Sequence, residues 1–140
     1  MGVIPSVSLL PVITCRKNAP CIKDCYARRM TRYTIVKSAY TRNTELYKND
    51  PDSYFMQLKT ALFVNRFFRL HVSGDFPSAD YFARCVEAVA SVPGCTVLAF
   101  TKQYEIVNEY VKNGGKIPTN FKIIYSTWGS WKPVNPYNFP

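Results

Sequence analysis

Hydrophobic positions divide the second half of this chain into alternating strand-like and helix-like segments. Short apolar runs bounded by turn-forming residues are typical of buried strands, and three are present: 67–72, 96–100 and 121–125. Apolar side chains at the three- and four-residue spacing of a helix lie between them, in two segments: 78–91 and 104–113. Ser78 is placed to cap the first of these helices, and Gly114-Gly115 is expected to end the second.

The pattern of the first half predicts mostly helix. Residues 24–47 repeat apolar positions at helical spacing, with a break near Thr31 to Thr34. Asp50 and Pro51 then predict the start of a helix to about residue 65, because aspartate caps helices and proline suits the first helical position. Residues 1–14 are apolar but contain two prolines, so any strand there is short or at a sheet edge. Aromatic residues at helical spacing are interpreted as core: Tyr26, Tyr33, Tyr54 and Phe55.

The order strand, helix, strand, helix, strand predicts the fold class. Crossovers of about 20 residues that contain a helix are typical of parallel strands joined by right-handed connections. We therefore expect an α/β protein with a parallel sheet, either open or forming a partial (β/α) barrel. Residues 1–128 are expected to form one domain. Residues 129–140 are predicted to be an irregular tail, which covers part of the molecule or marks a chain cut before its next element.

Composition agrees with a folded domain and adds a charge asymmetry. Of 140 residues, 47% are hydrophobic, and no apolar run is long enough to span a bilayer. The N-terminal residues do not have the basic and long apolar regions of a signal peptide, so a cytoplasmic location is expected. The net charge is +9, and residues 16–48 hold nine basic but only two acidic residues. This segment predicts an anionic partner, such as nucleic acid or a phosphorylated or carboxylate-bearing cofactor; the alternative is a solvated basic face.

Three of the five cysteines, Cys15, Cys21 and Cys25, lie within eleven residues. Such a cluster is typical of ligands for a soft metal or an iron–sulfur cluster. Three thiolates on a [4Fe–4S] cluster leave one position open to a substrate or cofactor. On zinc, a fourth ligand such as His71 would close a structural site. A third interpretation is a structural or partner protein with reduced, unligated thiols. Cys85 and Cys95 are interpreted as ordinary buried residues.

Polar residues follow each predicted strand, where parallel α/β proteins place their working groups. They are His71, Ser73, Asp75, Thr101, Lys102, Ser126 and Thr127. Gly74 is expected to let a ligand approach the backbone closely. If the cysteine loop follows an N-terminal strand, it joins the same rim. Strand alternation predicts that Arg69, His71 and Ser73 share one face.

Several motifs together resemble the phage "gene product 88" family. In order along residues 6–127 they are Cys15-x5-Cys21-x3-Cys25-Tyr26-Ala27, Arg42-Asn43, Arg69-Leu-His-Val-Ser-Gly-Asp-Phe76 with Tyr81 following, and Phe100-Thr-Lys102. That family is in turn similar to radical S-adenosylmethionine (SAM) proteins, which carry a three-cysteine loop after the first strand of a partial barrel. Their usual spacing is Cys-x3-Cys-x2-Cys, which differs from the spacing here.

The resemblance implies a radical SAM-like iron–sulfur protein of phage or mobile-element origin that modifies a nucleic acid or nucleotide. Cys15, Cys21 and Cys25 would bind three irons of a [4Fe–4S] cluster, and SAM the fourth. The resemblance places Ser73, Gly74 and Asp75 at the SAM amino group, and Thr101, Lys102 and Ser126 at SAM or the substrate. Arg42, Asn43, Arg69 and His71 are further candidates. The alternative function is a non-catalytic, zinc-stabilised, basic nucleic-acid-binding module.

Overall fold

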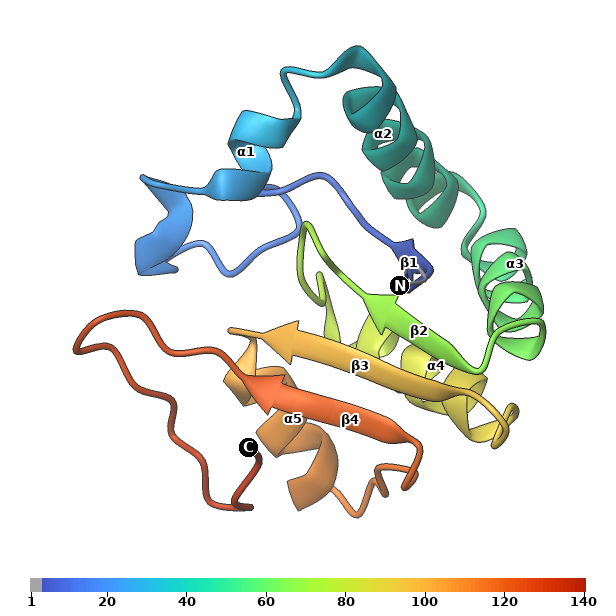
Figure 1. The fold of residues 1–140 in the computed structure, drawn as a ribbon. Coiled ribbons are helices and arrows are strands. Elements are labelled where there is room, and N and C mark those ends of the chain that lie inside the picture. The colour runs from blue at the N-terminus through green and yellow to red at the C-terminus, as the bar shows by residue number, and fades with distance from the viewer. Residues whose placement is uncertain (1–3) are drawn as a thin grey trace.

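A computed structural model describes residues 4–140, which form an open, all-parallel sheet with helices in the crossovers (Figure 1). The strand order is β1-β2-β3-β4, and each strand pairs with its neighbour in parallel. The strands are β1 (Ser6–Val7), β2 (Phe67–Leu70), β3 (Thr96–Thr101) and β4 (Phe121–Tyr125). The predicted α/β class and the short edge strand at the N-terminus are both confirmed.

Two of the helices, α3 and α4, begin at the caps that the sequence predicts. They are η1 (Pro20–Ile22, a 3-10 turn), α1 (Tyr26–Met30), α2 (Thr34–Asn49), α3 (Pro51–Phe63), α4 (Ala79–Ala90) and α5 (Tyr104–Lys112). The Asp50 carboxylate accepts a hydrogen bond from the Ser53 N–H at 3.0 Å, and the Ser78 hydroxyl accepts one from the Tyr81 N–H at 3.1 Å. These bonds satisfy N–H groups that have no partner within the helix. The predicted break near Thr31 to Thr34 separates α1 from α2.

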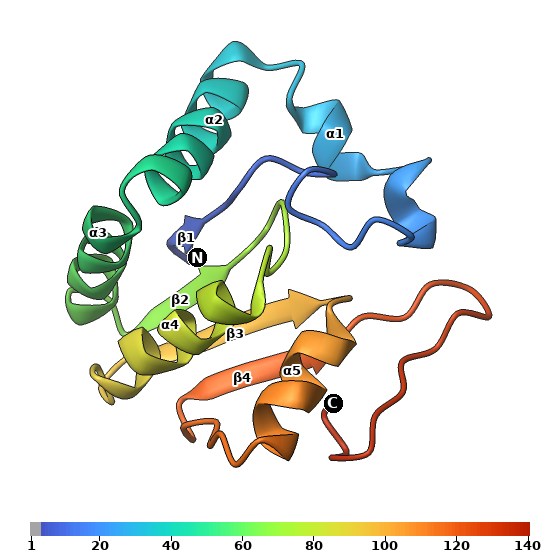
Figure 2. The same cartoon turned by 180° about the vertical axis from the view of Figure 1, so that it is seen from behind.

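One face of the sheet is covered by helices. Figure 1 shows the strands in front of α4 and α5, and Figure 2 shows the same helices from their own side; α3 packs against α4, and α4 against α5. Alternate strand residues are buried in this core: Phe68, Leu70, Val97, Ala99, Phe121, Ile123 and Tyr125. Phe67, on the opposite face, is 51% exposed. No helix of the described residues is long and apolar enough to cross a membrane.

Two sequence predictions are corrected by the backbone and by burial. β2 ends at Leu70 rather than Val72, because His71 takes a left-handed φ of 59°, which interrupts strand geometry. Tyr54 and Phe55 of α3 lie in the core as predicted. Tyr26 and Tyr33 do not, since they are 60% and 64% exposed. Helical spacing gives the relative positions of these rings, but only tertiary packing decides whether their side of the helix is covered.

The long crossover between β1 and β2 is anchored to β1 by α2. The Thr44 hydroxyl is buried in α2 and accepts a hydrogen bond from the Leu10 N–H at 2.9 Å. The Asn43 amide donates to the Ser8 carbonyl at 3.0 Å. These bonds fix the residues just before the cysteine loop, so the loop starts at the carboxyl end of the sheet.

The tail after β4 is irregular but packed. The Trp131 ring centroid lies 5.1 Å from that of Tyr104, and the Phe139 ring lies 5.1 Å from that of Tyr125. The Tyr125 N–H donates to the Pro140 carbonyl at 2.6 Å. The tail therefore covers the end of β4 and the start of α5, as one of the two alternatives for this segment predicted.

Gly74 lies at a close approach of two chain segments. Its φ is +80°, and a Cβ atom there would lie 2.6 Å from the Thr14 hydroxyl and 3.0 Å from the Leu9 Cβ. The side on which Gly74 lacks a side chain thus faces the protein's own β1–loop segment. The prediction that this glycine makes room for a ligand is replaced by a packing role.

We expect Gly74→Ala to destabilise the protein by about 2–4 kcal/mol, since it adds a steric clash to an unfavourable φ. Gly114→Ala is the matched control. Gly114 has a φ of +87° with no atom within 4 Å of the added Cβ, so only the backbone cost of about 1 kcal/mol applies. Urea unfolding of both variants measures the difference. Equal destabilisation of the two variants would show that the close approach is absent.

Candidate functional site

A cavity of about 340 Å³ lies at the carboxyl end of the sheet. It brings together all three clustered cysteines and all six predicted cofactor-binding residues: Cys15, Cys21, Cys25, Ser73, Gly74, Asp75, Thr101, Lys102 and Ser126. Arg69 and His71 also line it. The predicted shared rim of cysteine loop and strand ends is therefore present as one open cavity, with a volume in the range of ligand pockets.

The thiol wall is built by three different local structures. Cys15 follows a turn in which its N–H donates to the Val12 carbonyl at 3.3 Å. Cys21 lies in η1, and Cys25 is the N-cap residue of α1. All three are half-buried and reduced. Burial, reinforced by the nearby Asp75 and the other two cysteines, raises the pKa of the Cys15 thiol to about 11. Metal binding here would release that proton.

The donor set suits a thiolate-bound metal group. Soft thiolate ligands select zinc, copper(I) or iron–sulfur clusters. Among residues 4–140, no three His, Cys, Asp or Glu side chains are gathered around a point that would hold a metal ion. The cysteines share a cavity without converging on one position. Their thiol chemistry fits the implied group, and all three belong to one short loop that lines the cavity.

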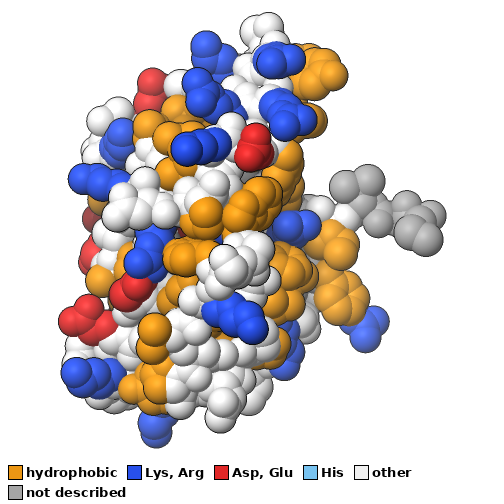
Figure 3. All heavy atoms as spheres, turned by 90° about the vertical axis from the view of Figure 1, so that its left-hand side faces the viewer, with side chains coloured by type: hydrophobic (Ala, Val, Ile, Leu, Met, Phe, Trp, Pro, Cys, Tyr) orange, Lys and Arg blue, Asp and Glu red, His pale blue; other side chains and the backbone are white. Residues whose placement is uncertain are grey.

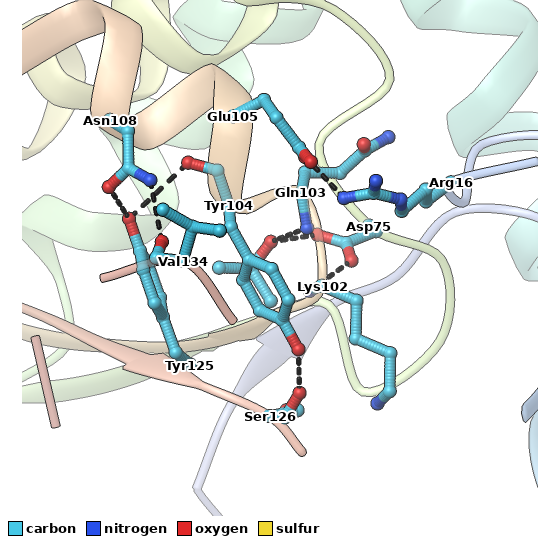
Figure 4. A network of polar contacts seen from close by, with 11 residues as sticks. Arg16, Asp75, Lys102, Gln103, Tyr104, Glu105, Asn108, Tyr125, Ser126 and Val134 are labelled. Carbon is cyan, nitrogen blue, oxygen red and sulfur yellow. Dashed lines mark hydrogen bonds and ion pairs between the residues drawn. The ribbon is translucent and has the colours of Figure 1, made fainter. Parts of the chain in front are cut away.

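Asp75 is the centre of a hydrogen-bond network that joins the β2–α4 loop to the end of β3 (Figure 4). Its carboxylate accepts from the Phe76 N–H at 2.8 Å, the Thr101 hydroxyl at 2.6 Å and the Lys102 N–H at 2.8 Å. The Thr101 hydroxyl in turn accepts from the Gln103 N–H at 2.9 Å. The polar atoms of Asp75 and Thr101 therefore shape the cavity wall and are already occupied within the protein.

Ser73 is used in the same way. Its hydroxyl donates to the Leu9 carbonyl at 3.0 Å, and its N–H donates to the Ser8 hydroxyl at 3.2 Å. Lys102 differs, because Figure 4 shows its side chain extending away from Asp75. At Ser126 the carbonyl accepts from the Tyr104 hydroxyl. Among the predicted cofactor-binding residues, Lys102 offers the cavity a free charged group.

His71 and Arg69 line the cavity with unsatisfied polar atoms. Three buried nitrogen atoms have no hydrogen-bond partner within the described chain: Nδ1 and Nε2 of His71, and Nε of Arg69. His71 is 4% exposed, and its ring centroid lies 5.2 Å from that of Phe76. Burial lowers the pKa of His71 to about 3, so the ring is neutral at physiological pH. The Arg69 guanidinium lies 5.0 Å from the centroid of Phe100.

The predicted strand alternation fails at His71, because its left-handed φ turns the side chain into the ring cluster of Phe76 and Tyr81. Arg69, His71 and Ser73 nevertheless all line the cavity. Three other candidates do not line it. Arg42 is exposed on α2, and the Asn43 side chain bonds to Ser8 near β1. Thr127 is exposed beyond the end of β4. Cys85 is buried in the core, as predicted, and Cys95 is also buried.

Two residues that line the cavity were not among the predicted site residues. The Tyr26 hydroxyl donates to the Val72 carbonyl at 2.5 Å, which ties α1 to the end of β2. Arg16 forms an ion pair with Glu105 of α5, and its guanidinium lies 5.4 Å from the ring centroid of Trp131. The only sequence signal for either was its place beside a cysteine. Both contacts join distant segments, which no local pattern reports.

The fold and the site thus define a parallel α/β protein with a cysteine-lined cavity at the carboxyl ends of its strands. A family model for gene product 88 matches residues 2–137, and the chain belongs to this family. The expected family is therefore confirmed, over nearly the whole chain. Neither curated proteins nor solved structures give a match.

The buried Asp75 generates a pH prediction. Burial raises the pKa of this carboxyl to about 6 in the folded protein, above its ordinary 3.8. The stability linked to the protonated form is present below pH 3.8 and is lost as the pH rises through 6. Relative to Asp75→Asn, the wild type should therefore lose on the order of 2–3 kcal/mol between pH 4 and 7. Urea unfolding across this range, with the exposed Glu87→Gln as control, measures it; a constant difference would contradict it.

His71→Phe should keep or increase the free energy of unfolding, by up to about 1–2 kcal/mol. The phenyl ring is flat like the imidazole but somewhat larger, and it removes the desolvation cost of two buried nitrogens that have no partner, which outweighs the cost of the tighter packing. Thermal and urea unfolding of the metal-free protein give the value. A loss of more than about 2 kcal/mol would mean that the imidazole has hydrogen-bond partners in the folded protein.

Proposed function

We propose that this member of the gene product 88 family is a radical SAM-like iron–sulfur enzyme that modifies a nucleic acid or nucleotide in the cytoplasm of a bacterial host. One observation carries the proposal: three clustered cysteines and six polar strand-end residues line the same cavity. The match to gene product 88 covers these residues without assigning the chemistry.

In this proposal Cys15, Cys21 and Cys25 hold a [4Fe–4S] cluster. When bound, the cluster supplies the electron that cleaves SAM reductively and starts radical chemistry on the substrate. The chain itself places and shields the reactants. Asp75 keeps the β2–α4 loop against β3, so that Gly74 and Lys102 stay at the cavity wall. Tyr26 and Arg16 narrow the mouth, which limits the entry of water.

A basic surface next to the cavity supports a nucleic-acid substrate. Figure 3 shows Lys and Arg side chains gathered over the upper part of the molecule, where α1 and α2 lie in Figure 1. Exposed aromatic and aliphatic side chains lie on the same segment: Tyr26, Met30, Tyr33 and Ile35. Basic residues interleaved with exposed rings are the usual elements of single-stranded nucleic-acid binding. We propose this surface as the approach of the substrate to the cavity.

A zinc site is the second candidate, and His71 favours it. Its ring is neutral and has two unpartnered nitrogens in the cavity that the cysteines line. A neutral imidazole and three thiolates would complete a tetrahedral zinc site. The protein would then be a zinc-stabilised nucleic-acid-binding module without catalysis.

Anaerobic reconstitution with iron and sulfide tests the proposal. We expect a brown protein with sulfur-to-iron charge-transfer absorption. Because the proposed cluster is [4Fe–4S], the iron content should be about four per chain. Cys25→Ala should lose most of this absorption, whereas Cys95→Ala, a buried cysteine outside the cavity, should retain it. With SAM and dithionite, the reconstituted wild type should release 5′-deoxyadenosine.

Two other results would each overturn the iron–sulfur assignment. A colourless protein that binds one zinc tightly, and loses it in His71→Phe, would establish the second candidate. A protein that holds neither iron nor zinc after purification and reconstitution would leave three reduced thiols and remove both.

A further inference from the structure

We propose that the cavity contains a phosphate-binding subsite formed by Arg69, His71 and Lys102, which takes the phosphate of a nucleotide or of a nucleic-acid end. This inference rests on the proposed function, in which the cavity is the reaction site. It adds the chemical class of the group that the substrate presents there.

Arg69 brings a positive charge without an acidic partner to the cavity. The ion pairs within residues 4–140 are Arg16 with Glu105 and Arg84 with Asp52, so Arg69 has no acidic partner. Its Nε is buried without a hydrogen bond, while the side chain lines the cavity. Arg69 as a whole is half-buried, so the cavity partly withdraws this cation from water without an acidic partner, which is unfavourable. An anion in the cavity would supply that partner.

His71 brings a hydrogen-bond donor to the same cavity. Its two ring nitrogens are buried and unpartnered within the described chain, whereas most buried polar groups in proteins are satisfied. Its backbone also holds a left-handed φ of 59°, which is unfavourable for histidine and typical of functional positions. A neutral imidazole donates one hydrogen bond and accepts one. It would therefore donate to a phosphate oxygen beside Arg69.

The charges that line the cavity favour phosphate over carboxylate. Lys102 places a second cation on the same cavity. The one carboxylate there, Asp75, already accepts from the Phe76 and Lys102 N–H groups and the Thr101 hydroxyl. Two cations suit a phosphate monoester, whose charge approaches −2, better than a carboxylate of charge −1. The planar guanidinium fork matches two phosphate oxygens, and the ammonium acts as a point charge.

Tyr26 indicates which group the ligand carries next to its phosphate. The Tyr26 ring lines the cavity and is 60% exposed, while its hydroxyl is held by the Val72 carbonyl. A fixed, exposed ring at the mouth is suited to stacking on a base. The subsite thus fits a nucleoside phosphate, with the phosphate inside and the base at the mouth.

Calorimetric titration with four small ligands tests the subsite: inorganic phosphate, adenosine 5′-monophosphate, adenosine and acetate. Adenosine 5′-monophosphate should bind most tightly and acetate not measurably. Arg69→Gln should weaken binding of the monophosphate at least about tenfold, by loss of a charge-assisted bidentate contact, and leave adenosine unaffected. Lys102→Gln, which removes the second cation of the cavity, should weaken it about fivefold.

Arg66→Gln is the matched control, because Arg66 also lies over a ring, that of Phe67, but outside the cavity. It should bind the monophosphate as the wild type does. Undiminished binding in both Arg69→Gln and Lys102→Gln, or no binding to the wild type, would overturn the subsite. Acetate binding as tightly as phosphate would overturn the choice of phosphate.

Single-stranded oligonucleotides with and without a 5′-phosphate distinguish the two sources of the group. A preference for the phosphorylated oligonucleotide that disappears in Arg69→Gln assigns the subsite to a nucleic-acid end, and its absence assigns it to the free nucleotide. Titrations are run on metal-free and on reconstituted protein. Phosphate binding by a protein that takes up no cluster on reconstitution would refute only the proposed function. A cluster of normal absorption without phosphate binding would refute only this inference.

Discussion

The whole site depends on one contact, where residues 8–9 after β1 meet residues 73–75 after β2. Three hydrogen bonds join the segments: Leu9 N–H to the Ser73 carbonyl, Ser73 hydroxyl to the Leu9 carbonyl, and Ser73 N–H to the Ser8 hydroxyl. The contact is possible because Gly74 has no side chain. Without it, the cysteine loop would lack its fixed position at the end of the sheet. The polar residues at the strand ends would then face solvent.

Asp75 extends this contact from the second strand to the third. Its burial is unfavourable for a carboxylate, and the three hydrogen bonds that it accepts offset part of that cost. In return, the β2–α4 loop, the end of β3 and the start of α5 are held together. Residues that sequence reasoning assigned to a cofactor thus first build the cavity. Lys102, Arg69 and His71 remain to meet a ligand.

The elements of the fold were predictable because their signals are local. Asp50-Pro51, Ser78 and Gly114 mark helix ends through side-chain and backbone chemistry that acts within a few residues. The gathering of Cys15, Asp75 and Lys102 was predictable too, because carboxyl ends of parallel strands meet at one edge. The pairing of Arg16 with Glu105 was not, since it depends on how two distant loops lie.

His71 and Tyr26 show a second limit of the sequence. Period-two alternation assumes a continuous strand, and the left-handed φ at His71 cannot be read from a run of apolar neighbours. The helical stripe that includes Tyr26 has the pattern of a core-facing helix. In the fold, however, that ring stays exposed at the mouth of the cavity. In both cases the departure from the simple pattern falls at the site, where local preferences are most often overridden.

The long segment between β1 and β2 determines when the site forms during synthesis of the protein. Ser6 and Val7 pair with Arg69 and Leu70, so the first strand can dock only after the second has been synthesised. During translation the cysteine loop, α1 and α2 emerge before the edge that will fix them. Pairing across so long a segment is slow relative to helix formation. The thiols are therefore open to the medium early in the life of each chain, and the cavity around them is completed late.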